Sequence, residues 1–333
     1  RWVLFRLMFG AGLIKLRADS CWRDLTCMYY HYETQPIPNP LSWYLHRFPH
    51  WVHQGSVLWT HFAELIAPWG VFAPRLVCYG AGIVAFAFQF LLILSGNLSW
   101  LNYITIALCI PCFDDAFLSR FIPIDPPFMP PISAVRQGVL AALTIVVLLL
   151  SIQPAINLFS SRQLMNASFE PLHLVNTYGA FGSVTKRRTE IIFEGTQDAV
   201  INSSTKWREY EFKAKPGDPA RLPPVVAPYH LRLDWLMWFA AMSDYQSHPW
   251  IVNLTAKFLQ GDRAVLGLLA KNPFPDSPPR YVRAILYDYR FTTAQERKKT
   301  GRWWSRGRLW EYLPPLSLND TGFREALEGE RWL

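Results

Sequence analysis

The sequence is short of charge. Only 17% of its 333 residues are Asp, Glu, Lys or Arg, whereas a soluble globular domain carries about 25%. Residues 1–157 hold 9 Lys and Arg against 7 Asp and Glu, and the remaining residues hold 24 against 18. The deficit therefore lies in the first half. The positive excess of the second half is scattered and forms no basic stripe, so no nucleic-acid partner is predicted.

Cysteine is also scarce. The chain has five, an odd number, and none follows Cys112, which excludes a disulfide-built scaffold. Cys21 and Cys27 lie close together and form a candidate disulfide if their loop faces an oxidising compartment. No charged segment followed by a short apolar run opens the chain, so no signal peptide is predicted. The chain instead begins at Arg1 inside an apolar segment, and we expect it to be a fragment that lacks an N-terminal part.

Long hydrophobic runs are present in the first half. A bilayer core requires about 20 apolar residues in a helix, and backbone groups in lipid must be satisfied internally. Four candidate membrane helices occur at 1–16, 58–73, 76–95 and 138–152. A fifth run at 98–112 is apolar but short, and a proline-rich linker at 122–132 cannot continue a helix.

The second half has the residue pattern expected of a solvated domain. Alternation of apolar and polar residues predicts a hairpin from 189–198 and 207–218 and a third strand at 280–291. Helical spacing predicts helices at 231–242, 249–260 and 262–272, and the tail at 297–315 is basic and aromatic. The predicted fold is a multi-pass α-helical membrane bundle at 1–157, followed by a soluble α+β domain with an antiparallel β-sheet at 158–333.

Ionisable residues interrupt the apolar half. Because charges within a membrane face the bundle interior and need partners, we interpret them as a structural polar cluster. The first interpretation of Lys15, near the end of a helix, is a side chain that extends its ammonium to the membrane interface. The second is an ion pair with Asp19, Glu33 or Asp114, and the third is a desolvated base. The predicted cluster consists of Arg6, Lys15, Asp19, His31, Glu33, His61, Glu64, Asp114 and Asp115.

Three pairs within this cluster have further interpretations. His61 and Glu64 share a helix face, which favours a hydrogen-bonded pair. Asp114 and Asp115 are expected to bridge to Arg6, Lys15 or Arg120. His31 and Glu33 suit an acid–base pair, but they supply too few ligands for a metal site. No metal and no cofactor is predicted.

Several blocks of the sequence resemble the lipase maturation factor family. RWVLFRLMFGAGLIKL, CWRDLTCMYYHYETQPIPNP, SGNLSWLN and CFDDAFL are similar to its membrane core. LVNTYGAFGSVTKRRTEIIFEGTQD, YEFKAKPGDPARLPPVVAPYHLRLDWLMWFAAM and the strand at 280–291 are similar to its C-terminal domain. The resemblance extends over essentially the whole chain.

This resemblance implies an integral membrane protein, located in the endoplasmic reticulum membrane if eukaryotic or in the inner membrane if bacterial. It implies a chaperone that assists the assembly of secreted dimeric lipases and is no enzyme. Its partners would be a protein client, engaged by the C-terminal domain in the lumen, and the lipid bilayer.

The same resemblance suggests roles for aromatic residues and for the sequons of the second half. The candidate client-binding residues are Trp235, Trp238, Phe239, Trp303, Trp304 and Trp310, although tryptophans of this kind often belong to a core. A luminal domain of a glycoprotein would accept glycans at the candidate sequons Asn166, Asn202, Asn253 and Asn319. Asn97 also begins a sequon but is flanked by apolar residues.

A second, more distant resemblance keeps an enzymatic alternative open. The helix end GAGLIKL and the aromatic turn after it are similar to the transmembrane core of vitamin-K-dependent carboxylase, where a lysine acts as a base. The matching residue is Lys15. The alternative function is a membrane enzyme that acts on a lipid-soluble substrate, with Lys15, His31 and Glu33 as its catalytic residues.

Overall fold

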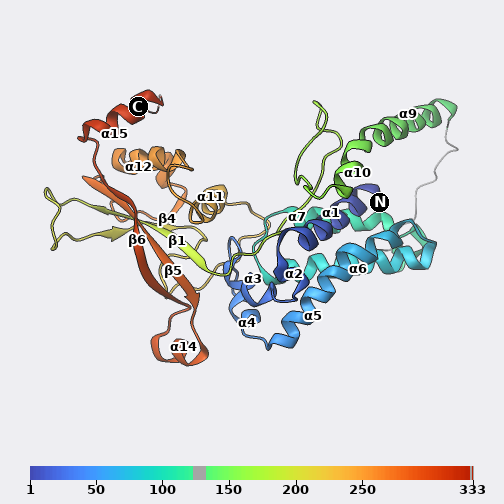
Figure 1. The fold of residues 1–333 in the computed structure, drawn as a ribbon, viewed down its shortest axis with the longest axis horizontal. Coiled ribbons are helices and arrows are strands. Elements are labelled where there is room, and N and C mark those ends of the chain that lie inside the picture. The colour runs from blue at the N-terminus through green and yellow to red at the C-terminus, as the bar shows by residue number, and fades with distance from the viewer. Residues whose placement is uncertain (123–132, 331, 333) are drawn as a thin grey trace. The chain divides into compact units, whose positions relative to one another are not determined.

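The computed structural model describes residues 1–122, 133–330 and 332, which form two compact units (Figure 1). The first unit contains Arg1–Tyr29, Phe48–Leu94 and Leu101–Val184. The second contains Tyr30–Arg47, Ser95–Trp100 and Thr185–Leu333. The units are therefore interleaved along the sequence and differ from the continuous ranges 1–157 and 158–333. Apart from Ile122, the predicted proline-rich linker lies outside the described residues.

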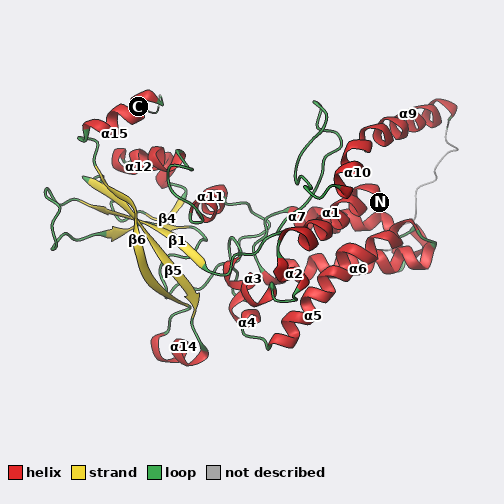
Figure 2. Ribbon diagram, in the orientation of Figure 1, coloured by secondary structure: helices red, strands yellow, loops and turns green. Residues whose placement is uncertain are grey.

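The first unit is helical (Figure 2). In its core, residues of α1 such as Leu4, Phe5 and Met8 pack with Ala81 and Phe88 of α6. Its helices are α1 (Trp2–Ala18), α2 (Ser20–Arg23), α5 (His50–His61), α6 (Arg75–Ser95), α7 (Leu101–Cys109), η3 (Ile110–Cys112), α8 (Asp115–Leu118), α9 (Ala134–Leu150) and α10 (Ile152–Phe159).

The predicted apolar runs are largely helical. In the run at 58–73 the helix type changes: α5 is followed by the π-helix η1 (Phe62–Ile66) and the 3₁₀-helix η2 (Ala67–Phe72). Pro68 lacks the N–H that would continue an α-helix. Among the described residues, two helical segments, Arg75–Ser95 and Ala134–Phe159, are long and apolar enough to cross a membrane.

The second unit is built on an antiparallel sheet with the strand order β2-β1-β5-β6. Its strands are β1 (Arg188–Thr196), β2 (Arg208–Glu209), β5 (Tyr281–Phe291) and β6 (Trp304–Leu316). Strands β3 (Glu211–Phe212) and β4 (Leu269–Lys271) form a separate pair. Its helices are α3 (Met28–Thr34), most of which belongs to this unit, α4 (Ser42–His46), α11 (Arg232–Ala240), α12 (Trp250–Gln260), α13 (Arg263–Leu266), α14 (Ala294–Thr300) and α15 (Thr321–Gly329).

The sheet buries apolar side chains on both faces because successive residues of a strand point to opposite sides. Ile191 and Phe193 of β1 pack in the large core with Phe258 of α12. Ile192, between them in sequence, packs in a smaller cluster with Trp43 of α4 and Trp304 of β6. The early segment that carries α4 is therefore part of the sheet unit.

Most predicted elements of the second half are confirmed. The hairpin is present as β1 and β2, the third strand as β5, and two of the helices as α11 and α12. The predicted helix at 262–272 is wrong, because only Arg263–Leu266 is helical and the chain then pairs as β4 with β3. Strand β6 was not predicted, since its arginines obscure the alternation expected of a strand.

Candidate functional site

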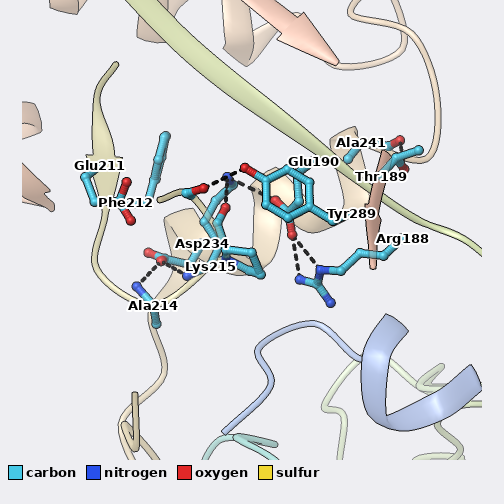
Figure 3. A network of polar contacts seen from close by, with 12 residues as sticks. Arg188, Thr189, Glu190, Glu211, Phe212, Ala214, Lys215, Asp234, Ala241 and Tyr289 are labelled. Carbon is cyan, nitrogen blue, oxygen red and sulfur yellow. Dashed lines mark hydrogen bonds and ion pairs between the residues drawn. The ribbon is translucent and has the colours of Figure 1, made fainter. Parts of the chain in front are cut away.

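A buried network of charges lies beside β1 in the second unit (Figure 3). Arg188 and Glu190 of β1 are joined by an ion pair of 2.6 Å, and Glu190 also pairs with Lys215 at 3.0 Å. All three side chains are almost completely buried. A buried ion pair stabilises a fold only when its remaining hydrogen-bonding groups are satisfied, so the partners of each group decide the role of the network.

Arg188 makes four hydrogen bonds and one further ion-pair contact. Its Nε donates to Glu190 Oε1 at 2.8 Å, and its Nη2 reaches the same oxygen and donates to the Pro36 carbonyl at 3.0 Å. Its Nη1 donates to the carbonyls of Glu33, at 2.9 Å, and Gln35, at 2.5 Å. One guanidinium therefore fixes the segment 33–36 against the first residue of β1, a task that uses the fork geometry of arginine.

Asp234 of α11 completes the network (Figure 3). Its Oδ1 accepts hydrogen bonds from the backbone N–H groups of Ala214, at 2.7 Å, and Lys215, at 2.8 Å. Burial raises the pKa of Asp234, and these two hydrogen bonds oppose the rise. Two cations and two carboxylates are thus enclosed together. Glu190 Oε2 has no hydrogen-bond partner in the described residues and is met only by the Lys215 ammonium, at 3.0 Å. Because each charge has an opposite charge or backbone groups beside it, we interpret the network as structural.

Glu33 is positioned within the same unit. Its Oε1 accepts a hydrogen bond from the N–H of Phe291, at 2.5 Å, and lies 3.9 Å from Nε2 of His46. Burial is the main cause that raises the pKa of Glu33, while the Phe291 N–H and the charge of Arg188 lower it. Glu33 therefore joins the early segment to the end of β5.

Lys15 and Glu64 form a closed ion pair inside the helical unit. Lys15 Nζ lies 2.5 Å from Glu64 Oε1 and 2.6 Å from Oε2, and the two side chains are only 8% and 5% exposed. The ammonium also lies 5.4 Å from the ring of Trp22. A Cβ at Gly12 would lie 2.7 Å from Leu65 Cδ2, so this glycine of α1 permits the close approach of η1 that brings Glu64 to Lys15.

The partners expected from the sequence are corrected by this geometry. Lys15 pairs with Glu64 and not with Asp19, Glu33 or Asp114, because η1 reorients the chain after α5. His61 does not bind Glu64 but lies 3.0 Å from the Trp22 carbonyl through Nε2. Asp114 pairs with Arg75 at 2.8 Å and not with Arg6, Lys15 or Arg120.

The remaining members of the predicted cluster lie in separate places. Asp19 caps α2 through Cys21 N–H and accepts from Val184 N–H, while Arg6 donates to the Asn176 carbonyl. Asp115 is exposed. His31 is buried in the second unit, where it packs edge-on against Tyr32. The structure therefore brings Lys15 and Glu64 together but distributes the other residues.

Cys21 and Cys27 are joined by a disulfide in the first unit. The bridge closes the short loop between α2 and α3, directly before the chain enters the second unit at Tyr30.

The candidate client-binding aromatics differ in exposure. Trp304 is only 1% exposed and stacks on Phe291, so it offers no surface to a client. Trp303 packs against the guanidinium of Arg297, 3.5 Å from the ring centre, and Trp238 donates to the Thr34 carbonyl. Trp235 is partly buried. Phe239 and Trp310 are the members with the largest exposed surface, at 47% and 59%.

The sequons also differ. Asn166, Asn202 and Asn319 are exposed in turns or loops. Asn253 lies within α12, and its hydroxyl partner Thr255 is fully buried. Asn97 is buried and binds the Pro224 carbonyl and the N–H groups of Val226 and Ala227.

The charged network around Arg188 has no counterpart among the site residues expected from the sequence. Glu190 carried a signal, because it is a charge at an inward position of a predicted strand. No sequence pattern indicates that Lys215 and Asp234 join this network. They come from a loop and from α11, and the sequence spacing does not show that these segments meet β1.

Comparisons with known proteins give matches along most of the chain. Residues 1–120 match the family model described as "Lipase maturation factor transmembrane domain", and residues 174–314 match "Lipase maturation factor C-terminal domain". A relative from Bos taurus, "Lipase maturation factor 1", is 48% identical over 96% of this chain and 61% of its own length. The corresponding protein from Homo sapiens is 46% identical over 96% of this chain and 60% of its own.

A more divergent relative from Homo sapiens, "Lipase maturation factor 2", is 29% identical over 98% of this chain and 60% of its own length. The chain thus spans about three fifths of the length of the curated relatives that it matches. No solved structure matches it.

We expect Arg188→Lys to destabilise the second unit although the charge is kept. A lysine cannot reach all the acceptors of Arg188, and each buried acceptor left unpaired costs about 1–3 kcal/mol. Thermal unfolding of the purified protein should show a lower Tm, and limited proteolysis should cut within 30–47. Arg280→Lys, at an exposed arginine, serves as the control. Equal stability of the two variants would refute the role assigned to Arg188.

We expect Glu33 to make stability depend on pH. Because its pKa is raised in the folded state, its contribution is complete below the ordinary value of 4.5 and is lost as the pH rises through the folded value. Glu33→Gln does not titrate. The Tm of the wild type relative to this variant should therefore be higher at about pH 4 than at about pH 7. The opposite sign would show that the Phe291 N–H outweighs burial.

We expect Lys15→Met to destabilise the helical unit by about 3–5 kcal/mol, because it leaves Glu64 buried without its counter-ion. The double variant Lys15→Met/Glu64→Leu should recover most of this loss, since no buried charge remains. Denaturation of detergent-solubilised protein, followed by tryptophan fluorescence, measures both. A double variant no more stable than the single one would argue against a simple structural pair.

Proposed function

Because the chain belongs to the lipase maturation factor family, we propose that it is part of a membrane-anchored factor that assists the folding and assembly of secreted lipases. The observation that carries this proposal is the match of both family models, one to the helical region and one to the sheet region of the same chain. The proposed role is that of a chaperone in the endoplasmic reticulum membrane, or in the inner membrane of a bacterium.

The proposed anchor is a multi-pass helical bundle. In the segment Ala134–Phe159, only 11% of the 18 most apolar consecutive residues are buried. Leu143, Leu148 and Leu149 are among the exposed side chains. An exposed apolar surface of this kind is rare in a soluble monomer but is the surface that lipid requires. The segment Arg75–Ser95 has a similar length and composition.

The proposed compartment of the second unit is an oxidising lumen. The disulfide between Cys21 and Cys27 is stable in such a compartment and is rare in the cytosol. Only two residues separate Cys27 from the second unit, which begins at Tyr30. Since two residues cannot cross a bilayer, the disulfide loop and the second unit share one side. The exposed sequons Asn202 and Asn319 would then be accessible to glycosylation.

The proposed client-binding surface lies on the second unit, within the predicted domain 158–333. Leu236, Phe239 and Met242 follow one another at a spacing of three residues, on α11 and directly after it, and are 44–47% exposed. Trp310 of β6 is a further exposed aromatic residue. Side chains of this type can hold the apolar surface that an unassembled lipase subunit presents.

The alternative of a membrane enzyme finds little support. A catalytic lysine needs a free, desolvated amine, whereas Lys15 is bound by both oxygens of Glu64. His31 and Glu33, which were predicted to act with Lys15, belong to the other unit.

The proposed function is tested by co-expression of the full-length protein with a secreted lipase, in cells that lack their own maturation factors. We expect the wild type to raise the secreted lipase activity per mass of lipase. The variants Phe239→Asp and Trp310→Asp should lower this gain several-fold, because a charge on the surface opposes apolar contact. Val200→Asp, at a side chain that is 69% exposed in a loop, is the matched control. An unchanged yield with and without the protein, across several lipases, would overturn the proposal.

A further inference from the structure

The outer edge of β6 is an open strand edge. Strand β6 has 13 residues and pairs with β5 on one side only. The start of this edge is covered, because the N–H groups of Trp303 and Trp304 donate to the Pro219 carbonyl at 2.9 and 3.1 Å. From Ser305 to Leu316, no hydrogen bond within the described residues reaches the outer backbone groups. The other sheet edge, β2, has only two residues.

The alternation of the strand shows which backbone groups point outward. In an antiparallel strand, every second residue directs its N–H and C=O to the same side. Trp304 directs its N–H outward to Pro219, away from β5. Arg306 and Arg308 follow at intervals of two, before the register shift, and therefore also direct their backbone N–H groups to the open side.

The first half of the open edge is basic. Arg308 of β6 and Arg302, two residues before the strand, are exposed, and neither has a salt bridge in the described part of the chain. The exposed acid Glu311 lies in the second half of the strand, after the register shift. Arg306 is paired with Glu209 at 2.5 Å. A cleft of about 490 Å³ borders the start of β6 and is lined by Arg302, Thr292 and Ser305, among others. Its two acidic groups are already engaged: Glu296 binds Arg290, and Asp218 caps Ala220.

We propose that the outer edge of β6 binds an extended, acidic segment of the client polypeptide as an additional strand. The inference rests on the proposed function and specifies how the client is recognised. The outward N–H and C=O groups supply main-chain hydrogen bonds, as in other cases of strand addition. Arg302 and Arg308 select acidic side chains by charge complementarity.

A second copy of this chain is a poorer occupant of the same edge. Antiparallel pairing about Gly307 would place Arg306 and Arg308 opposite the arginines of the other copy, and like charges directly opposed destabilise a sheet. An acidic strand would instead place carboxylates opposite these arginines, and opposite charges across a strand pair are stabilising. A Cβ at Gly307 would meet nothing within 4 Å, so side chains of an added strand find open space there.

A binding measurement tests the edge directly. The full-length protein in detergent is titrated into a fluorescent peptide of about ten alternating Glu and Thr residues, a length typical of a strand. We expect binding that weakens by about tenfold in Arg302→Glu/Arg308→Glu, through charge. Arg308→Pro should weaken it similarly, because it removes an outward N–H while an edge strand tolerates proline. Arg324→Glu, exposed on α15, should bind like the wild type.

Matched peptides separate strand addition from simple attraction of charges. The same peptide with alternate backbone nitrogens methylated keeps its carboxylates but cannot pair with β6, so its binding should be lost. A peptide of alternating Lys and Thr should also fail to bind. Equal binding of the methylated peptide, or an unaffected Arg308→Pro variant, would show a polyanion site and overturn the proposal. Self-association that Arg308→Pro abolishes would overturn it in favour of a second copy.

Co-expression distinguishes this inference from the proposed function. If the wild type raises active lipase and the edge variants do not, while Arg324→Glu does, the edge is supported as the client site. If the edge variants act like the wild type, the inference fails and the proposed function stands. If the wild type itself gives no gain, the proposed function fails, and the peptide measurements alone decide whether the edge accepts an acidic strand.

Discussion

The hydrogen bonds of Arg188 are the constraint on which the second unit depends. This side chain stands at the first residue of β1 and fixes three carbonyls of the segment 33–36, which precedes it by about 150 residues in the sequence. Glu190 balances its charge and also binds Lys215. The early segment can then place Trp43 against the second face of the sheet. A sheet domain that would otherwise begin near residue 185 thus takes part of its core from residues 30–47.

Both units contain buried charges, but the arrangement of their partners differs. In the helical unit, one cation and one anion are isolated as a pair, and Gly12 supplies the space for their approach. In the sheet unit, charges are linked into a network with backbone groups, so that each is shared. In both cases each buried charge has an opposite charge beside it, which indicates a structural role. The exposed surface of the second unit, where we propose that the client binds, carries apolar side chains of α11 and an edge of β6 without a neighbouring strand in the described residues.

The proposed membrane anchor and the proposed client-binding unit differ in the surface that each must expose. Lipid accepts exposed leucines on the segment Ala134–Phe159, whereas water around the second unit requires that such side chains be few. The open edge of β6 is protected in ways that natural proteins use against aggregation: arginines along it, register shifts against β5, and Pro314 with Pro315 at its end. The proposed client binding requires that such an edge stay accessible, and the proposed selectivity for acidic segments would limit pairing with other strands.

The sequence by itself determined the helical character of the first half, strands β1 and β5, helices α11 and α12, and the family. Apolar runs, and the alternation of apolar and polar residues, are local properties that can be read from the sequence without knowing the fold. Only the tertiary structure decided that Lys15 pairs with Glu64, that the helix type changes within 58–73, and that His31 and Glu33 belong to the sheet unit. Partner choice depends on which distant segments meet in three dimensions. A charge in a sequence shows that a partner is needed but not which residue supplies it.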